Sequence, residues 1–247
     1  MHAAKPLPAA VAAPVAAAAA AAAPSACPPA GFDSLADFDL AAFARAGPWY
    51  SVLQNEVFYQ PKDQLYCVRA AYVPRDPADF SKGVAVLNTA NRGGVAGPAV
   101  GSSASGGGFA GIVAFPDAAA AKANPSTGAS KLRVLPSFLE YAFKLKPGSS
   151  LISGPYWIVA AAPDLSWALI SGGAPTNPSN GKCRTGRAGK QTFLDINGSG
   201  LWVFAQDPLA GAAATAPALA AAAALGYDTS TLLPVTQAGC SYPAVSA

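Results

Sequence analysis

The sequence predicts an all-β domain of eight short strands in series, arranged as a sandwich or an up-and-down barrel, followed by one C-terminal helix. Strand-like segments rich in Val, Ile, Tyr and Trp alternate with turn residues, and none has a sustained helical period before residue 208. Short strands joined by short connections are typical of both architectures. The eight segments are Trp49–Phe58, Leu65–Val73, Gly83–Thr89, Phe109–Phe115, Lys131–Pro136, Tyr156–Ala161, Trp167–Ser171 and Leu201–Gln206.

The C-terminal helix is predicted from an Ala-rich stretch that follows Pro208 and extends to Leu225. Gly226 comes next and is a natural residue to end a helix. Pro217 lies inside the stretch and cannot donate a backbone hydrogen bond, so we expect the helix to begin there. A helix of this length is marginal alone, so we expect it to pack on the outer wall of the barrel.

The chain of 247 residues contains one folded domain, which we place at residues 27–247. Residues 1–26 consist mainly of Ala and Pro, and predict either a targeting segment with a small-residue cleavage site or a disordered tail. Without this tail and two Gly-rich stretches, 93–108 and 172–189, about 180 residues remain, a size typical of one domain. The longest apolar run, 15–23, is far shorter than the roughly 20 residues of a membrane-spanning helix.

Charge and histidine content exclude several classes of function. The net charge is +3, and Lys and Arg form no dense cluster with aromatic residues, so no nucleic acid is expected as a partner. The only histidine, His2, lies in the N-terminal tail, which excludes a His-based metal site, a Ser-His-Asp triad and a Cys-His pair from the folded domain. These exclusions remove most hydrolytic chemistry. We expect no metal, no cofactor and no catalytic residue.

Four cysteines, Cys27, Cys67, Cys183 and Cys240, are spread over the chain without a C-x-x-C pair. Their even number fits two disulfides in an oxidising compartment, and four buried free thiols are the alternative. Together with the N-terminal tail, the disulfide interpretation predicts secretion or the lumen of an organelle, such as a plastid or thylakoid.

Two runs of residues resemble the first two signature regions of the lipocalins, barrels that carry small apolar molecules. The first is Gly47-Pro48-Trp49-Tyr50, and the second extends from Pro155-Tyr156-Trp157 through Pro163-Asp164-Leu165-Ser166-Trp167. The similarity is to the apolipoprotein D-like branch, which includes bacterial and plant lipocalins. The motifs that carry it are Cys27-Pro28, Cys67 to Tyr72 in the pattern C-x-x-A-x-Y, Val86-Leu87-Asn88, Gly226-Tyr227-Asp228 and the closing Cys240.

The resemblance implies a closed eight-stranded antiparallel barrel of the lipocalin, or calycin, type. It implies two disulfides, Cys27–Cys183 and Cys67–Cys240. It also gives structural roles to Gly47, Trp49 and Asp164. The chain departs from the pattern at Gln206, where lipocalins usually carry an Arg that lies across the signature tryptophan in a cation–π contact. We expect its loss to soften the closed end of the barrel.

Alternation along the strands predicts which side chains face the barrel interior. If Cys67 points outward, Tyr72 points inward, and if Trp202 points inward, so does Gln206. The family's ligand pocket uses the positions of Tyr72, Asn88 and Trp202. The predicted ligand-binding residues are Val68, Ala70, Tyr72, Val84, Val86, Asn88, Leu132, Val134, Trp202 and Phe204. The alternative is that these residues fill the barrel as plain core, but several are small enough to leave room for one small ligand.

The resemblance implies that the protein binds, and transports or sequesters, a fatty acid, sterol, retinoid or carotenoid-like lipid. Basic residues of the mouth loops would attract a fatty acid, although they equally solubilise long loops. They are Arg92, Lys144, Lys146, Lys182, Arg184, Arg187 and Lys190. The alternatives are a lipid-modifying enzyme on the same barrel and a stress-protective lipocalin in transient contact with a membrane surface. We expect a monomer or weak dimer. Asn197-Gly198-Ser199 is either a hairpin turn or a glycosylation sequon.

Overall fold

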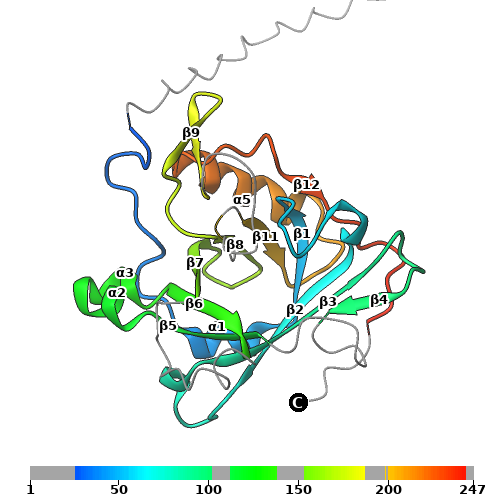
Figure 1. Cartoon of the computed structure of the whole chain (residues 1–247), viewed down its shortest axis with the longest axis horizontal. Coiled ribbons are helices and arrows are strands. Elements are labelled where there is room, and N and C mark those ends of the chain that lie inside the picture. The colour runs from blue at the N-terminus through cyan, green and yellow to red at the C-terminus, as the bar shows by residue number, and fades with distance from the viewer. Residues whose placement is uncertain (1–25, 102–111, 138–152, 187–197, 199, 243–247) are drawn as a thin grey trace, which may run out of the picture.

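The computed structural model describes residues 26–101, 112–137, 153–186, 198 and 200–242, which form one antiparallel barrel (Figure 1). The last wall strand pairs with the first, so the wall closes on itself. In chain order the wall strands are β1 (Trp49–Gln54), β2 (Tyr66–Pro74), β3 (Val84–Asn91), β5 (Ile112–Pro116), β6 (Lys131–Pro136), β7 (Gly154–Ala161), β8 (Trp167–Ser171) and β11 (Leu201–Ala205). The prediction of an eight-stranded antiparallel barrel is confirmed.

β1 is shorter than the sequence predicts, because the chain turns back on itself after the strand. Val57 and Gln60 form a backbone bridge, so the segment expected to reach Phe58 leaves the sheet at Gln54. The short turns η1 (Lys62–Gln64) and η2 (Phe80–Lys82) precede β2 and β3. The remaining short strands are β4 (Ala99–Gly101), which pairs with β3, β9 (Asn177–Ser179), which pairs with β10 (Lys182–Arg184), and β12 (Leu233–Pro234), which pairs with β1.

Within the described residues, three short helices precede residue 208, where the sequence showed no sustained helical period. They are α1 (Leu40–Ala46), α2 (Ala118–Ala123) and α3 (Pro125–Gly128). Each follows a residue whose side chain accepts backbone hydrogen bonds from the first turn: Asp39, Asp117 and Asn124. Helices of 7, 6 and 4 residues are too short to produce a recognisable period, so capping side chains are their main signal.

α5 (Ala212–Ala224) packs on the outside of the barrel against β7, β8 and β11, as expected (Figure 1). Its buried residues Ala214, Ala218 and Ala222 are spaced four apart and therefore share one face. The expected start at Pro217 is wrong, since the helix begins at Ala212 and contains the proline. The proline removes one helical hydrogen bond, and packing of the alanine face on the barrel offsets this loss. Gly226, with a φ of 80°, follows the last turn as predicted.

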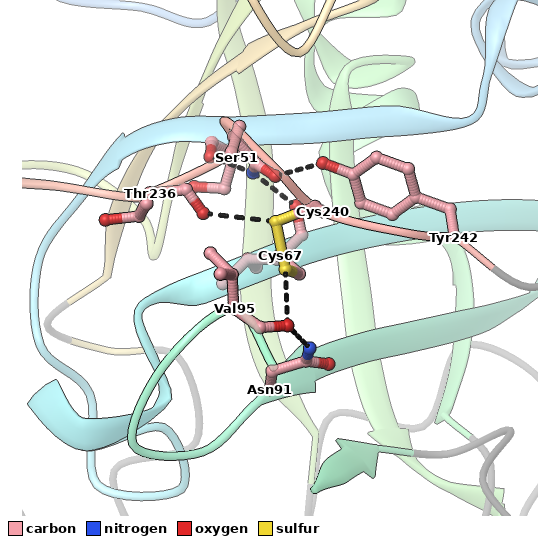
Figure 2. The surroundings of a disulfide bond; sticks show 9 residues. Ser51, Cys67, Asn91, Val95, Thr236, Cys240 and Tyr242 are labelled. Carbon is pink, nitrogen blue, oxygen red and sulfur yellow. Dashed lines mark hydrogen bonds between the residues drawn. A yellow bond between two sulfur atoms is a disulfide. The ribbon is translucent and has the colours of Figure 1, made fainter. Parts of the chain in front are cut away.

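Both disulfides implied by the resemblance are present, and no described cysteine is a free thiol. Cys27–Cys183 joins the N-terminal segment to β10, and Cys67–Cys240 joins the C-terminal segment to β2 (Figure 2). Gln237 adds to the second connection, because its Nε2 donates to the carbonyls of Ser51 at 2.7 Å and Val68 at 2.8 Å. The two disulfides fit an oxidising compartment.

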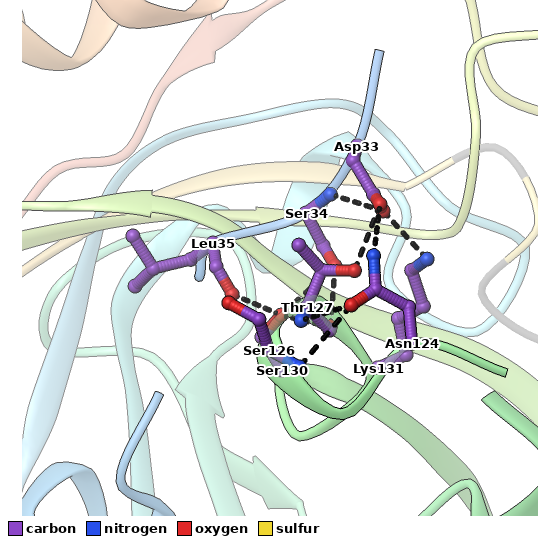
Figure 3. Close-up of polar contacts among 8 residues, drawn as sticks. All are labelled: Asp33, Ser34, Leu35, Asn124, Ser126, Thr127, Ser130 and Lys131. Carbon is purple, nitrogen blue, oxygen red and sulfur yellow. Dashed lines mark hydrogen bonds and ion pairs between the residues drawn. The ribbon is translucent and has the colours of Figure 1, made fainter. Parts of the chain in front are cut away.

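A polar cluster holds the segment before α1 against α3 and the start of β6 (Figure 3). Asp33 accepts a hydrogen bond from Thr127 Oγ1 at 2.8 Å and pairs with Lys131 Nζ at 2.6 Å. The buried Ser130 donates to the carbonyl of Leu35 at 2.7 Å. Burial raises the pKa of Asp33, but hydrogen bonds from Lys131, Thr127 and the amide of Ser34 outweigh it, so the pKa lies below its usual value.

Candidate ligand-binding site

The barrel interior is one continuous cluster of apolar and aromatic side chains, to which all eight wall strands contribute. Along β2, β3, β6, β7, β8 and β11 its members are two residues apart, the spacing of one face of a strand. The members from the wall are Trp49, Ala70, Tyr72, Val84, Val86, Ala114, Leu132, Val134, Tyr156, Ile158, Ala168, Ile170, Trp202 and Phe204. A molecule placed among these side chains would meet a largely apolar environment.

Most of the predicted ligand-binding residues belong to this interior cluster. The members predicted from the sequence are Ala70, Tyr72, Val84, Val86, Leu132, Val134, Trp202 and Phe204. Asn88 is half-buried on β3, paired in register with Ala70. Strand alternation therefore placed these eight side chains on the same face of the wall, whereas it failed for Val68.

Val68 packs in a separate cluster with Leu65, Ala90 and Val235, under the C-terminal segment. The pairing of β2 with β3 shifts register between residues 66 and 69, and Cys67 has a φ of 55°, so the backbone does not keep a regular pleat there. The expectation that Val68 lines the interior with Tyr72 relied on unbroken alternation across this irregularity, and it is wrong.

The base of the barrel is formed by Trp49 and Phe43. Their rings stack at a centroid distance of 4.6 Å, and Trp49 Nε1 donates to the carbonyl of Phe43 at 3.0 Å. Both side chains are fully buried. Phe43 was not predicted from the sequence, although Asp39 followed by Leu40, Phe43 and Ala44 has the cap and apolar spacing of a short helix.

The expectation that Gln206 points into the barrel is wrong. The residue is exposed, and its backbone amide donates to the carbonyl of Ser166 at 3.2 Å, at the turn between β7 and β8. β11 ends at Ala205, so the alternation used to place Gln206 ends one residue before it. Phe43, rather than residue 206, covers the indole of Trp49.

Asp164 and Gly47, the two other residues expected to have structural roles, each stabilise their local surroundings. Asp164 Oδ1 accepts hydrogen bonds from the amide of Ser166 at 3.0 Å and from its hydroxyl at 2.7 Å, which stabilises the turn between β7 and β8. The same bonds hold the pKa of Asp164 below its usual value. A side chain on Gly47 would approach Trp49 Cδ1 to 3.2 Å, so the glycine permits close packing at the base.

Phenol groups are the main polar feature of the interior. The hydroxyls of Tyr72 and Tyr156 form a short hydrogen bond, and the ring of Tyr59, from the connection between β1 and β2, packs against the same cluster. Burial raises the pKa of all three phenols. Of the three tyrosines, only Tyr72 was predicted from the sequence, although Tyr156 and Ile158 share the spacing of one strand face.

Trp202 lies at the opposite end of β1 from the base, since it pairs in register with Gln54 while Trp49 begins the strand. Its ring is 6.3 Å from that of Tyr156, and the planes are inclined by 37°. A Cβ on Gly200 would lie 1.7 Å from the Trp202 ring, so Gly200 leaves the space that the indole occupies. This requirement for glycine was not apparent from the sequence.

Little of the predicted basic rim falls within the described residues. Arg92 is one of its members, and its Nε lies 3.5 Å from Asp63 Oδ2, so that carboxylate partly balances its charge. Lys182 and Arg184 belong to β10. Lys144, Lys146, Arg187 and Lys190 lie outside the described residues, as do Asn197 and residues 1–25 of the N-terminal tail.

The described residues provide neither a metal-binding cluster nor a membrane-spanning helix. Among residues 26–242, apart from the gaps named above, no group of three or more His, Cys, Asp or Glu side chains is placed to hold a metal ion. Within the same described ranges, no helix has the length and apolar character needed to cross a membrane.

No protein-family model and no curated protein matches the chain. Solved structures do. Insecticyanin from the tobacco hornworm, Manduca sexta, is similar over 89% of this chain and 93% of its own, with 16% identity and a TM-score of 0.50. The topology of the closed barrel, the C-terminal helix on its outer wall and this similarity decide the architecture. The fold is that of a lipocalin.

Other solved lipocalin structures are similar at lower scores. The cockroach allergen Per a 4 covers 83% of this chain and 92% of its own, with 12% identity and a TM-score of 0.48. Lobster apocrustacyanin A1 covers 84% of this chain and 91% of its own, with 14% identity and a TM-score of 0.46. At these identities and scores, neither similarity says anything about the ligand.

Proposed function

We propose that this protein is a lipocalin of the apolipoprotein D-like branch that binds a small hydrophobic molecule inside its barrel and transports or sequesters it. The observation that carries the proposal is the interior cluster, in which eight strands contribute apolar and aromatic side chains above a base closed by Phe43. Small-molecule sites are typically apolar and concave, with a few polar groups that fix orientation. The candidate ligands are fatty acids, sterols, retinoids and carotenoid-like lipids.

Binding without chemistry is favoured over the enzyme alternative by the kind of polar group in the interior. Its phenols are Tyr59, Tyr72 and Tyr156, and burial raises the pKa of each, so they are neutral near pH 7. A neutral phenol with a raised pKa is a poor general base and a poor nucleophile. The acidic residues near the base, such as Asp39 and Asp164, act as helix and turn caps.

The rest of the proposal concerns the destination of the protein. We place the lipocalin domain at residues 27–247 and assign residues 1–26 to a targeting segment or a disordered tail. Two disulfides favour secretion or an organelle lumen, including that of a plastid or thylakoid. A monomer or weak dimer fits a protein whose ligand is held within a single barrel.

One observation favours the alternative of transient membrane contact. The ring of Phe58 lies in the turn between Val57 and Gln60 and is 57% exposed. Aromatic rings are favoured at the membrane–water interface. Sedimentation with vesicles of neutral lipid would test this alternative, since Phe58→Ser should lower the bound fraction while leaving binding of soluble ligands unchanged.

Native mass spectrometry of the protein isolated from its own cells tests the proposed function. We expect a complex that releases one small hydrophobic molecule on denaturation, with a mature chain that begins near Cys27. A ligand-free chain that also takes up no lipid from a mixed extract would contradict the binding proposal. A full-length N-terminus would contradict only the targeting assignment.

A further inference from the structure

The hydrogen bond between Tyr72 and Tyr156 crosses the interior of the barrel. Tyr72 lies on β2 and Tyr156 on β7. In the closed order of the wall, these strands are four steps apart in either direction, through β3, β5 and β6 or through β1, β11 and β8. They therefore belong to opposite walls, and the two hydroxyls meet between them.

This phenol pair lies directly beside the aromatic base. The ring of Tyr72 packs edge-on against Phe43 at 5.3 Å, and Phe43 in turn stacks on Trp49. On the other side, the ring of Tyr156 is 6.3 Å from Trp202, which lies toward the end of the barrel opposite α1. A ligand that enters from that end and passes Trp202 would meet the phenol pair before the base.

The phenol pair retains hydrogen-bonding capacity after its own bond is formed. Two hydroxyls carry two hydrogens and four lone pairs, and their mutual bond uses one hydrogen and one lone pair. The second hydrogen can be donated to an oxygen atom of a ligand, and the remaining lone pairs can accept from a ligand hydroxyl. Tyr59 packs against the same cluster and interacts electrostatically with both tyrosines.

The charged side chains that are buried among the described residues face away from this pair. Arg69 precedes the inward Ala70 on β2, and its guanidinium lies 5.6 Å from the ring of Tyr242 in the C-terminal segment. Asp228 accepts hydrogen bonds from Ser179 and Asn180, outside the barrel wall. A carboxylate beside the phenols would thus lose its hydration without gaining a cation from this part of the chain.

We propose that Tyr72 and Tyr156 together recognise a neutral oxygen, a carbonyl or a hydroxyl, at the inner end of the ligand and discriminate against a carboxylate. This inference rests on the proposed function and specifies its ligand class. On this proposal, the ligand is selected by the phenol pair deep in the barrel, rather than by basic residues that attract fatty acids at the mouth. The raised pKa of both phenols has the same cause, since the surroundings disfavour negative charge.

Retinol, retinal and retinoic acid provide the test, because they share one hydrocarbon skeleton and differ in the end group. At pH 7.5, fluorescence titration should give dissociation constants for retinol and retinal at least tenfold below that for retinoate. Lowering the pH to 5 should strengthen binding of retinoic acid at least tenfold, as its carboxyl becomes partly neutral, and should leave retinol unchanged. Hexadecanol and hexadecanoic acid repeat the comparison on a second skeleton.

Variants connect the selectivity to the two tyrosines. Tyr72→Phe and Tyr156→Phe keep both rings and should each weaken binding of retinal about three- to tenfold, while retinoate changes less. Tyr227→Phe is the matched control, since this buried tyrosine donates to the carbonyl of Gly173 in the cluster under α5. It should leave the affinities for all three retinoids unchanged.

The outcomes separate this inference from the proposed function. Retinoate that binds as tightly as retinal at pH 7.5, or phenylalanine variants that match the control, would overturn the selectivity and leave the binding function intact. Failure of every member of both series, and of every other ligand in a broad apolar panel that includes sterols and carotenoids, would overturn both. The comparison of end groups and pH in the unmodified protein decides the question even if a tyrosine variant does not fold.

Discussion

The indole of Trp49 stacks on the ring of Phe43 at 4.6 Å, with an angle of 18° between the planes, and donates a hydrogen bond to the same residue's carbonyl. This pair joins the first strand of the wall to the helix that covers the base. Phe43, rather than the exposed Gln206, provides this ring contact with Trp49.

Phe43→Ala should therefore destabilise the barrel strongly. Removing a fully buried phenylalanine deletes apolar contacts and leaves a cavity, which typically costs about 3–5 kcal/mol of unfolding free energy. Chemical denaturation followed by tryptophan fluorescence measures the change. Phe58→Ala is the matched control, because Phe58 is 57% exposed and its truncation should change the unfolding free energy by less than about 0.5 kcal/mol. Equal effects of the two substitutions would contradict the role of Phe43.

Replacing Gln206 with the arginine that is usual at this position in lipocalins should not stabilise this protein. Gln206 is exposed and follows the last residue of β11, while Phe43 already covers Trp49. We expect the melting temperature of Gln206→Arg to stay within about 2 °C of the unmodified protein, since surface substitutions rarely change stability much. A rise of 5 °C or more would show that the indole still offers a free face.

Removal of the Cys67–Cys240 disulfide should lower stability and release the C-terminal segment. The bond joins residues 173 apart, and losing a native disulfide typically costs about 2–5 kcal/mol. In the Cys67→Ser, Cys240→Ser double variant, we expect faster hydrogen exchange at the backbone amides of residue 67 and Thr236. These amides donate to the carbonyls of Thr236 and Leu65 and so join the C-terminal segment to the start of β2. The equivalent variant of Cys27–Cys183 serves as control and should leave exchange at these amides slow. Peptide mapping without reductant checks the pairing itself.

Acid should destabilise the protein through Asp228. Burial raises its pKa, but hydrogen bonds from Ser179, Ser230 and Asn180 outweigh this effect and lower the pKa below the ordinary 3.8. A folded-state pKa below the unfolded value stabilises the fold above about pH 4, and the contribution disappears as the pH falls through the folded-state pKa. Asp228→Asn should flatten the dependence of unfolding free energy on pH below 4. An unchanged slope in that variant would exclude Asp228 as a source of acid sensitivity.

Gly200→Ala should displace Trp202 without unfolding the barrel. The added methyl group would lie 1.7 Å from the ring, so the indole has to move. We expect a shift of the fluorescence maximum and at least a fivefold loss of affinity for apolar ligands. Unchanged affinity in Gly200→Ala would argue against Trp202 as part of the binding site.

The parts of the fold that follow from a regular repeat could be predicted from the sequence. Alternation identified the strand segments and placed eight interior side chains, including Val84, Leu132 and Phe204, because the pleat is regular there. The disulfide pairing followed from the resemblance rather than from the residues themselves. The order of the wall likewise required the family pattern.

The errors occur where the backbone leaves its repeat. Val68 lies next to a register shift, and Gln206 lies one residue beyond the end of β11. Pro217 was expected to begin a helix that in fact contains it, because packing of three alanines on the barrel offsets the missing bond. Contacts between residues far apart in the sequence could not be predicted either, since neither a period nor a motif connects Tyr72 with Tyr156.

Fluorescence titration of the unmodified protein with apolar ligands, in parallel with Trp202→Phe, tests binding inside the barrel most directly. We expect at least one ligand to bind with a dissociation constant below about 100 μM, roughly −5.5 kcal/mol, and to change the tryptophan emission. Trp202→Phe should remove most of that change, with Trp49, Trp157 and Trp167 supplying a constant background. If no ligand of a broad panel reaches 100 μM, the interior is a filled core and the protein does not carry small hydrophobic molecules.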